Sequence, residues 1–341
     1  MRILARPAFS NHATDPGNAA LYTEIRRLED ATVCEGTMKA MLFCQADVLH
    51  IHWPDNILRS RRWCAAAARV AVLFTLLSLR RWRGTKIVWT AHNSFSHEHH
   101  HPKLEQLFWK GLFKRLDGII AHSNTVCAEL RERTGGRIPI CVIPLSHFRG
   151  LYPSPSAGPR PPAAIRRLGF VGRIRQYKGV PDLIEAFLPY ADPDVRLVVR
   201  GKPENPEIAA AMTNLCARDA RIDLRLGFLS PADLTNEIAA LDAVVLPFKW
   251  VTNSGSALLS LSLGTRVVVP GTAYFLELQS EFGPEWVYCY EGDLSPSVIA
   301  GICAWTKRPT SRPAPELSEQ RGLPWAAKAT FAFFQTVMVT P

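Results

Sequence analysis

Short apolar runs alternate with helix-length segments along most of the chain. The runs are rich in β-branched residues and are bounded by turn-forming residues, a pattern typical of strands buried on both faces of a parallel sheet. The predicted strands are residues 2–5, 48–52, 86–90, 118–121 and 142–144, followed by 168–172, 195–200, 222–226, 243–247, 267–269 and 286–290. We therefore expect an α/β fold built from parallel sheets.

One segment interrupts this alternation. Residues 151–165 hold five prolines and a glycine, a mixture that resists both helix and strand. A chain of 341 residues also exceeds the usual size of one domain. We expect two Rossmann-like domains at 1–150 and 166–341, joined by a linker at 151–165, with the last helix a candidate to return to the first domain. Two such domains would face each other across a cleft, and parallel sheets bind ligands at the carboxyl ends of their strands.

The charge is distributed unevenly. Of the formal net charge of +10, residues 1–150 carry 21 Lys and Arg against 12 Asp and Glu, whereas residues 151–341 carry 19 against 18. The first half is expected to meet an anionic partner, which leaves nucleic acid, an anionic lipid surface and a phosphorylated substrate open. The eight cysteines form no CxxC pair and no cleavable leader is recognisable, so we expect reduced thiols in a cytosolic setting.

The loop after the strand at 168–172 combines glycine with cations. Gly172 allows close approach of a backbone, and Arg175 and Lys178 carry charges that match a diphosphate. The alternative is that these cations are simply solvated in an ordinary loop.

A second loop strengthens the diphosphate interpretation. It follows the strand at 243–247, holds Lys249 and then runs through Asn253, Ser254, Gly255 and Ser256 into an apolar segment. If Asn253 or Ser254 caps a helix there, the first backbone N–H groups of that helix would point at an anion. Gly201, Lys202 and Phe228 lie between the two loops in sequence, each just after a predicted strand. They are candidates to contact the base and ribose of a nucleotide, and the alternative is that they form ordinary turns.

Several blocks of sequence, taken in order, resemble one family. FVGRIRQYKGVPDLIEAF, VVRGKP, LGFLSPADL and ALDAVVLPFK resemble the donor domain of GT-B glycosyltransferases. HIHWPD, AHNSFSHE, IRQYKG, LPFKWVTNSG and FGPEWVYCYEGD are similar to the GDP-mannose:glycolipid β-mannosyltransferases of xanthan-type exopolysaccharide assembly. The resemblance implies a GT-B fold and transfer of mannose from GDP-mannose onto a polyprenyl-diphosphate-linked oligosaccharide. It also implies a peripheral enzyme at the cytoplasmic face of a bacterial inner membrane. No metal or other cofactor is expected if Arg175, Lys178 and the turn at Ser254 stabilise the departing nucleotide diphosphate.

The chain departs from retaining GT-B enzymes at one point. Those relatives carry two acidic residues eight positions apart, and the matching positions here are Val251 and Leu259. No acidic residue lies between Asp242 and Glu277. The resemblance therefore implies inverting displacement, which converts an α-linked donor into a β-linked product.

An inverting transfer needs a base for the acceptor hydroxyl. The candidates, on loops after predicted strands of the first domain, are His92, then Asp55, then Glu98. His50 is interpreted as a structural histidine at a strand end. The histidines at 97 and 99–101 raise the alternative of a metal site, but adjacent loop histidines do not readily converge on one ion, and no metal is expected.

Residues 59–86 contain eight basic residues and no acidic one, around an apolar run at 70–79. The run is shorter than the roughly 20 residues that span a bilayer. Its flanks predict a helix lying in lipid headgroups, or contact with the acceptor's diphosphate. The predicted contact residues are Arg61, Arg62, Trp63, Arg80, Arg81, Trp82 and Arg83. The alternative is a buried helix of the first domain.

Two other functions stay open from the residues. A UDP-sugar such as UDP-glucose or UDP-glucuronate is an alternative donor, because a few contacts set the specificity for base and sugar. Nucleic-acid binding would also use the basic half, but the chain has no recognition helix, RNA-binding signature or zinc spacing, and no nucleic-acid partner is expected.

Overall fold

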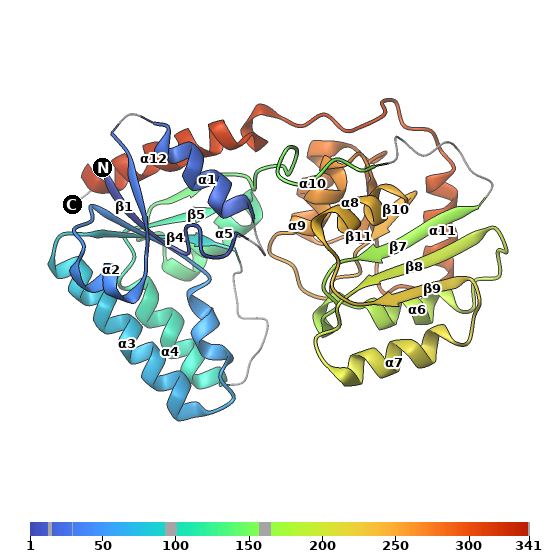
Figure 1. The fold of residues 1–341 in the computed structure, drawn as a ribbon, viewed down its shortest axis with the longest axis horizontal. Helices are drawn as coiled ribbons and strands as arrows, with labels where there is room; N and C mark the ends of the chain where they lie inside the picture. The colour runs from blue at the N-terminus through green and yellow to red at the C-terminus, as the bar shows by residue number, and fades with distance from the viewer. Residues whose placement is uncertain (13–15, 29, 93–100, 157–164, 340–341) are drawn as a thin grey trace. The chain divides into compact units, whose positions relative to one another are not determined.

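The computed structural model describes residues 1–12, 16–28, 30–92, 101–156 and 165–339. The chain divides into two compact units, which are treated separately below. Unit 1 comprises Met1–Ser146 and Ser318–Pro341, and unit 2 comprises His147–Leu317. Both units are parallel α/β structures, so the predicted fold class is confirmed (Figure 1).

Unit 1 is built on a parallel sheet with the strand order β2-β1-β3-β4-β5-β6. Its strands are β1 (Arg2–Arg6), β2 (Thr32–Glu35), β3 (Val48–His52), β4 (Lys86–Ala91), β5 (Gly118–Ala121) and β6 (Ile140–Val142). Its helices are α1 (Pro16–Arg26), α2 (Met38–Phe43), α3 (Trp63–Trp82), α4 (Pro102–Phe113), α5 (Asn124–Thr134) and α12 (Leu323–Val339), with 3-10 turns at Pro54–Arg59 and Glu319–Arg321.

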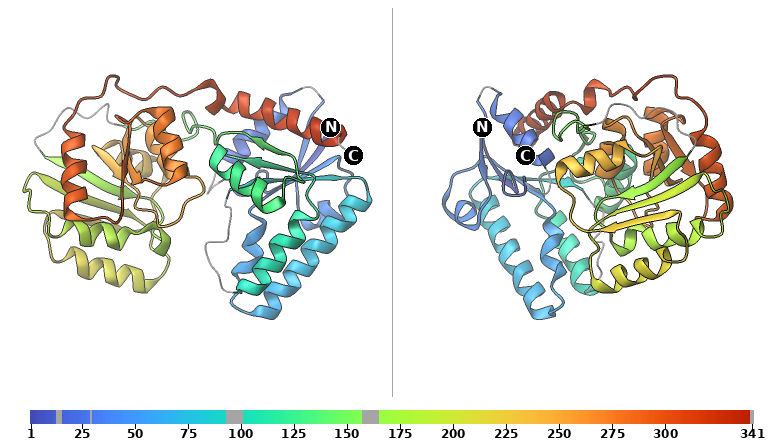
Figure 2. Two further views of the ribbon diagram at one scale, coloured as in Figure 1. Left: turned by 180° about the vertical axis from the view of Figure 1, so that it is seen from behind. Right: turned by 45° about the vertical axis from the view of Figure 1, so that its right-hand side comes forward.

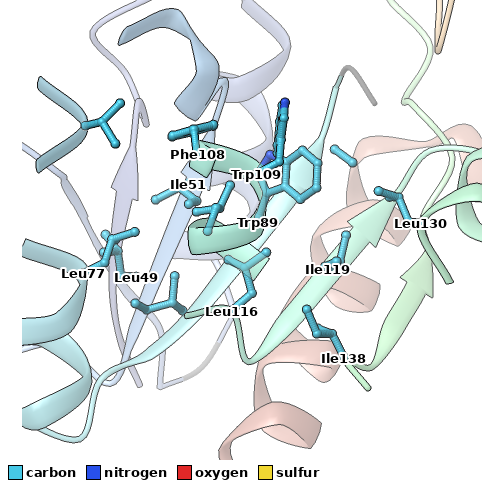
Figure 3. Packing of buried hydrophobic residues seen from close by; sticks show 14 of the residues in the cluster. Leu49, Ile51, Leu77, Trp89, Phe108, Trp109, Leu116, Ile119, Leu130 and Ile138 are labelled. Atoms are coloured by element: carbon cyan, nitrogen blue, oxygen red, sulfur yellow. The ribbon is translucent and has the colours of Figure 1, made fainter. Parts of the chain in front are cut away.

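Alternation along the strands gives this sheet two different faces. Leu49 and Ile51 of β3 pack with α3, α4 and α5 in one cluster, which Figure 3 shows around Trp89. The residues between them point the other way, toward α1 and α12. The helix α12 lies along α1 although almost the whole chain separates them in sequence, and its Phe334 is fully buried (Figure 2).

Unit 2 has the strand order β12-β11-β10-β7-β8-β9, again with every pair parallel. Its strands are β7 (Arg166–Val171), β8 (Val195–Gly201), β9 (Ile222–Leu226), β10 (Ala243–Val245), β11 (Arg266–Pro270) and β12 (Val287–Tyr290). Its helices are α6 (Val180–Phe187), α7 (Pro206–Cys216), α8 (Pro231–Ala239), α9 (Gly255–Ser262), α10 (Ala273–Phe282) and α11 (Pro296–Thr306), with a 3-10 turn at Gln176–Lys178. Helices α6, α7 and α11 pack together beside the sheet, and Figure 1 shows α8 and α10 on the opposite face from α6 and α7.

Each sheet reverses its winding direction at one place. In unit 2 the first strand, β7, has β8 and β9 on one side and β10, β11 and β12 on the other. In unit 1 the reversal lies between β1 and β3. Loops leaving the carboxyl ends of adjacent strands diverge at such a point, and doubly wound proteins bind ligands in the resulting crevice. In unit 2 these are the loops after β7 and β10, the two that the sequence singled out.

Candidate functional site

The loop after β7 turns sharply into α6. Gly179 has a left-handed backbone with φ of 62°, and a Cβ there would lie 2.3 Å from the carbonyl oxygen of Pro247 in the loop after β10. The backbone N–H of Lys249 donates to the carbonyl of Tyr177 at 2.9 Å. Glycine is therefore required for the two loops to meet at the reversal point of the sheet.

Lys178 ends the 3-10 turn with its amine enclosed by protein. The ammonium lies 5.7 Å from the ring centre of Phe170 and 5.4 Å from that of Phe248, close enough for cation–π attraction. Burial, with smaller contributions from Arg175 and Arg173, lowers its pKa to about 8. No ion pair to Lys178 occurs within the described ranges, so its charge is poorly compensated by this unit alone. An anionic ligand would compensate it.

The loops after β7, β8 and β9 are joined by backbone hydrogen bonds. The N–H of Ile174 donates to the carbonyl of Lys202 at 3.0 Å, and that of Gly227 to the carbonyl of Gly201 at 2.9 Å. Arg175 lies 3.9 Å from the carboxylate of Glu204, a separation at the limit of an ion pair. These contacts fix the three loops, which carry predicted donor-binding residues, next to one another at the carboxyl edge of the sheet.

Gly172 and Gly201 approach each other more closely than other residues could. A Cβ on Gly201 would lie 1.7 Å from the carbonyl oxygen of Gly172, and its φ of 149° also favours glycine. This contact fixes the start of the loop that carries the predicted cations.

The helix α9 begins at Gly255, and Ser254 is its N-cap. The Ser254 hydroxyl accepts from the N–H of Ala257 at 3.1 Å, while its own N–H donates to the hydroxyl of Tyr274 at 3.0 Å. Ser254 is 3% exposed, so it orders the turn while the N–H groups of Gly255 and Ser256 open the helix. Of the two cap candidates, Ser254 takes the position and Asn253 precedes it.

The remaining predicted donor residues differ in their surroundings. Lys249 forms an ion pair with Asp182 at 2.8 Å, which compensates part of its charge. Phe228 is 80% exposed just beyond β9 and so presents an aromatic face to solvent. Leu259 is buried in α9, and no carboxylate replaces it within that helix.

Unit 1 gathers histidines at the carboxyl ends of three neighbouring strands. His52 ends β3, His92 follows β4 and His122 follows β5. Nδ1 of His52 lies 2.7 Å from Nε2 of His92, and the ring of His92 stacks on Trp53 at 4.1 Å and contacts that of His122 at 5.1 Å. This cluster includes His92, the first candidate for the base.

Burial keeps these imidazoles neutral. It is the main cause that lowers the pKa of His122 to about 4 and the pKa of His92 and His52 well below 6.5. A neutral imidazole has one N–H and one lone pair, so its role depends on which nitrogen carries the hydrogen.

Asp55, the second candidate, lies in the 3-10 turn after β3 and is 5% exposed. Burial raises its pKa to about 6, against a smaller opposing effect of its own backbone and of Arg59. A carboxylate with this pKa is mostly ionised at pH 7 and accepts a proton more readily than an ordinary aspartate. Glu98 lies outside the described residues.

The proposed metal alternative also falls mostly outside the described residues, because His97, His99 and His100 are not among them. His101 is described, and its Nε2 lies 2.9 Å from the carbonyl oxygen of Ser60. Within the part of the chain that the structure describes, no three His, Cys, Asp or Glu side chains form a group that could hold a metal ion.

The helix α3 is longer than the apolar run predicted. It covers 20 residues and is the one helix, within the described ranges, that could cross a membrane by length and composition alone. Its face with Ala66, Val70 and Leu77 is nevertheless buried in unit 1 against the sheet and its neighbouring helices. The buried-helix interpretation therefore holds for one face of α3.

The opposite face and the ends of α3 are exposed. Trp63 is 58% and Trp82 83% exposed, and Arg61 and Arg62 are exposed beside the first of them. Leu107 of the neighbouring helix α4 adds a further exposed apolar side chain.

Arg80 corrects the prediction for this surface. It is fully buried, and its guanidinium donates to the carbonyls of Met41, Cys44 and Ala40 at the end of α2. Five N–H donors on a planar group satisfy carbonyls that a helix end leaves unpaired, so Arg80 is structural. Two neighbours are partly engaged: Arg81 pairs with Asp117 at 2.8 Å, and Arg83 donates to the carbonyl of Leu42.

Three residues of the unit 1 cluster were missed from the sequence. Tyr22 of α1, whose hydroxyl lies 2.6 Å from Nε2 of His52 in β3, and His52 itself are identified only by this contact between two distant elements. His122 had a signal, because Ala121-His122 at the end of β5 repeats Ala91-His92 at the end of β4.

Comparison with known protein families matches both units. The model of glycosyltransferase family 4 matches residues 26–146, and that of glycosyl transferases group 1 matches residues 165–281. A GDP-mannose:glycolipid 4-beta-D-mannosyltransferase from Xanthomonas campestris pv. campestris is 31% identical over 287 residues, 83% of this chain and 78% of the relative. A 2-deoxystreptamine glucosyltransferase from Streptomyces kanamyceticus is 28% identical over 47% of this chain and 40% of its own.

Solved structures show the same fold at low identity. A glycosyltransferase from Rickettsia africae superposes with a TM-score of 0.63 at 14% identity, over all of this chain and 99% of the other. HepE of Anabaena, in complex with UDP and glucose, superposes with a TM-score of 0.59 at 16% identity, over 98% and 94% of the two chains.

Proposed function

We propose that this chain, which belongs to the GT-B glycosyltransferase family of the GDP-mannose:glycolipid β-mannosyltransferases, transfers mannose from GDP-mannose to a polyprenyl-diphosphate-linked oligosaccharide. The enzyme class follows from the family. Donor, acceptor and stereochemistry are the proposal, and the relative that is 31% identical supports the first two.

The observation that carries the donor site is the poorly compensated charge of Lys178 at the reversal point of the unit 2 sheet. The start of α9 lies in the adjacent loop, where N–H groups of a first helical turn attract anions. In this proposal Arg175, Lys178 and the start of α9 bind the diphosphate. They would stabilise the departing GDP without a metal or another cofactor.

The proposed chemistry is a single displacement. The acceptor hydroxyl oxygen bonds to the anomeric carbon while the bond from that carbon to the β-phosphate oxygen breaks, and GDP leaves with the bonding electrons. A base in unit 1 takes the hydroxyl proton, with His92 and Asp55 as the described candidates. The apolar residues at positions 251 and 259 support inversion, because neither can act as a carboxylate.

The proposed setting is the cytoplasmic face of a bacterial inner membrane. The exposed tryptophans at the two ends of α3 and the exposed arginines beside Trp63 suit a surface of anionic headgroups. The binding of purified protein to vesicles containing anionic lipid, compared with binding to duplex DNA at physiological salt, tests this setting. Preference for the duplex would favour the nucleic-acid alternative instead.

The decisive experiment is mass spectrometry of a polyprenyl-diphosphate oligosaccharide incubated with GDP-mannose, UDP-glucose and UDP-glucuronate. We expect addition of one hexose from GDP-mannose, with a β anomer by NMR and undiminished turnover in EDTA. Preference for a UDP-sugar would replace the donor, an α anomer would exclude inversion, and no turnover with any donor would reject the proposal.

A further inference from the structure

A continuous chain of hydrogen bonds runs through unit 1 behind His92. Thr90 Oγ1 lies 2.7 Å from Nε2 of His50, whose Nδ1 lies 2.7 Å from the hydroxyl of Tyr22. That hydroxyl lies 2.6 Å from Nε2 of His52, and Nδ1 of His52 lies 2.7 Å from Nε2 of His92. All five side chains are at most 8% exposed.

The strands of the sheet bring the residues of this hydrogen-bond chain together. His50 and His52 alternate with Leu49 and Ile51, so both point to the face covered by α1 and α12. The register places His52 of β3 beside Thr90 of β4. Tyr22 of α1 reaches down between the two histidines, which it contacts edge-on at 5.9 and 5.8 Å between ring centres.

This chain of hydrogen bonds permits only two arrangements of its hydrogens. Tyr22 has a single hydroxyl hydrogen, so it donates to one histidine and accepts from the other. If it donates to His52, then His50, His52 and His92 each carry their hydrogen on Nδ1. If it donates to His50, all three carry it on Nε2. Because burial keeps the pKa of each ring below 6.5, the three imidazoles share one tautomer near neutral pH.

Thr90 decides between the two arrangements. Within the ranges that the structure describes, Nε2 of His50 is the one hydrogen-bond partner of the Thr90 hydroxyl. Only the Nδ1–H arrangement gives the Thr90 hydrogen an acceptor, and a buried hydroxyl hydrogen without an acceptor is unfavourable. Among these five side chains, Thr90 therefore sets the direction of the hydrogen bonds.

We propose that Tyr22, His50, His52 and Thr90 are positioning residues that hold the hydrogen of His92 on Nδ1, so that His92 acts in the transfer as an N–H donor and not as the proton acceptor. In this arrangement Nε2 of His92 accepts the hydrogen of His52 Nδ1, so its lone pair is not available to take a proton from the acceptor. Of the two described base candidates, Asp55 then remains.

The tautomer is a property of the free protein, whereas its effect on turnover rests on the proposed function. Long-range proton–nitrogen NMR on the full chain labelled with ¹⁵N-histidine reads it directly, with signals assigned from single His→Gln variants. We expect protonated Nδ1 and unprotonated Nε2 for His50, His52 and His92, unchanged between about pH 7 and 9. Nε2–H signals for His92 would overturn the proposal even in a fully active enzyme.

A matched pair of variants tests the role of Thr90. Thr90→Val removes the hydroxyl at nearly constant volume and should give mixed tautomers at all three histidines, whereas Thr90→Ser should keep the wild-type signals. A wild-type tautomer in Thr90→Val would show that Thr90 does not set the direction.

Tyr22→Phe separates positioning from a structural role. It should lower kcat by roughly tenfold, with donor KM unchanged and the melting temperature measured alongside. Unchanged kcat, or a loss seen only as a higher KM, would reject the positioning role. If the wild-type protein turned over no donor at all, the proposed function would fail while the NMR result still stood.

Discussion

Replacing Lys178 with methionine should stabilise the free protein and weaken nucleotide binding at the same time. The wild-type amine is enclosed near Phe170 and Phe248, and its pKa is lowered from 10.5 to about 8. Each pKa unit corresponds to about 1.4 kcal/mol, so holding this charge costs the free fold about 3 kcal/mol at neutral pH. Because the side chain is partly exposed, we discount this to roughly 1–2 kcal/mol for screening by water.

Methionine keeps most of the packing against the two rings and carries no charge. We therefore expect the free energy of unfolding to rise by about 1–2 kcal/mol, and the melting temperature by a few degrees. The sign depends on pH. The protonated amine disfavours the folded state below pH 8, and this effect fades as the pH rises toward 10.5, where the advantage of the variant should vanish.

Nucleotide binding should change in the opposite direction. Loss of one charge-assisted contact with a diphosphate, worth about 1.5–3 kcal/mol, should weaken GDP binding roughly ten- to hundredfold. Wild-type affinity should also fall above pH 8 as Lys178 loses its proton, whereas the variant should not show this dependence. Calorimetric titration with GDP at pH 7 and 9, and melting without nucleotide, measure both effects.

Lys307→Met is the control, since this exposed lysine follows α11 at the end of the same unit. It should leave GDP affinity and its pH dependence unchanged. If Lys178→Met bound GDP as tightly as the wild type, or kept the loss of affinity above pH 8, the assignment of Lys178 to the diphosphate would be wrong.

Three further changes test other parts of the molecule. Gly201→Ala should lower the free energy of unfolding, measured by chemical denaturation, by at least about 1–3 kcal/mol, because the new Cβ would meet the carbonyl of Gly172. Gly227→Ala should lower it less, since φ there is 155° but the space is open. Equal losses in the two variants would exclude the clash as the cause. Asp55→Asn should lower kcat at least about a hundredfold with GDP affinity intact. The kcat/KM of the wild type should fall below about pH 6, where the raised pKa leaves the carboxyl of Asp55 protonated. A kcat/KM that does not change with pH in this range would exclude Asp55 as the base. Trp82→Gln should reduce binding to anionic vesicles several-fold, and unchanged binding would exclude this end of α3 from the membrane surface.

The strands were predictable because they are continuous apolar runs. The predictions at 48–52, 118–121 and 222–226 agree with β3, β5 and β9 to the residue. Strand β2 was missed, since Thr32–Glu35 shows only one buried residue and gives no apolar run. The order of the strands in each sheet could not be predicted from the local hydrophobic pattern either, because it is set by packing between segments distant in sequence.

The residues of the candidate site could likewise be predicted only where the residue types within one loop indicate their role. Glycine and cations after β7 can be recognised in the sequence, since their types suit a diphosphate whatever surrounds them. Arg80 could not be distinguished from its exposed neighbours, because its burial depends on carbonyls at the end of α2. The tyrosine of the hydrogen-bond chain comes from another element than its histidines, so no spacing indicates it.

The packing of α12 in unit 1 has a consequence for how the protein is made. The helix supplies Phe333, Phe334 and Val337 to the core around β1 and α1, and the ring of Phe334 contacts His50 at 5.0 Å. A ribosome synthesises all of unit 2 between α5 and α12, so unit 2 can fold as an uninterrupted segment while unit 1 still lacks part of its core. Until α12 has been synthesised, the N-terminal part of unit 1 keeps this apolar surface uncovered, and its hydrogen-bonded histidines are not yet enclosed.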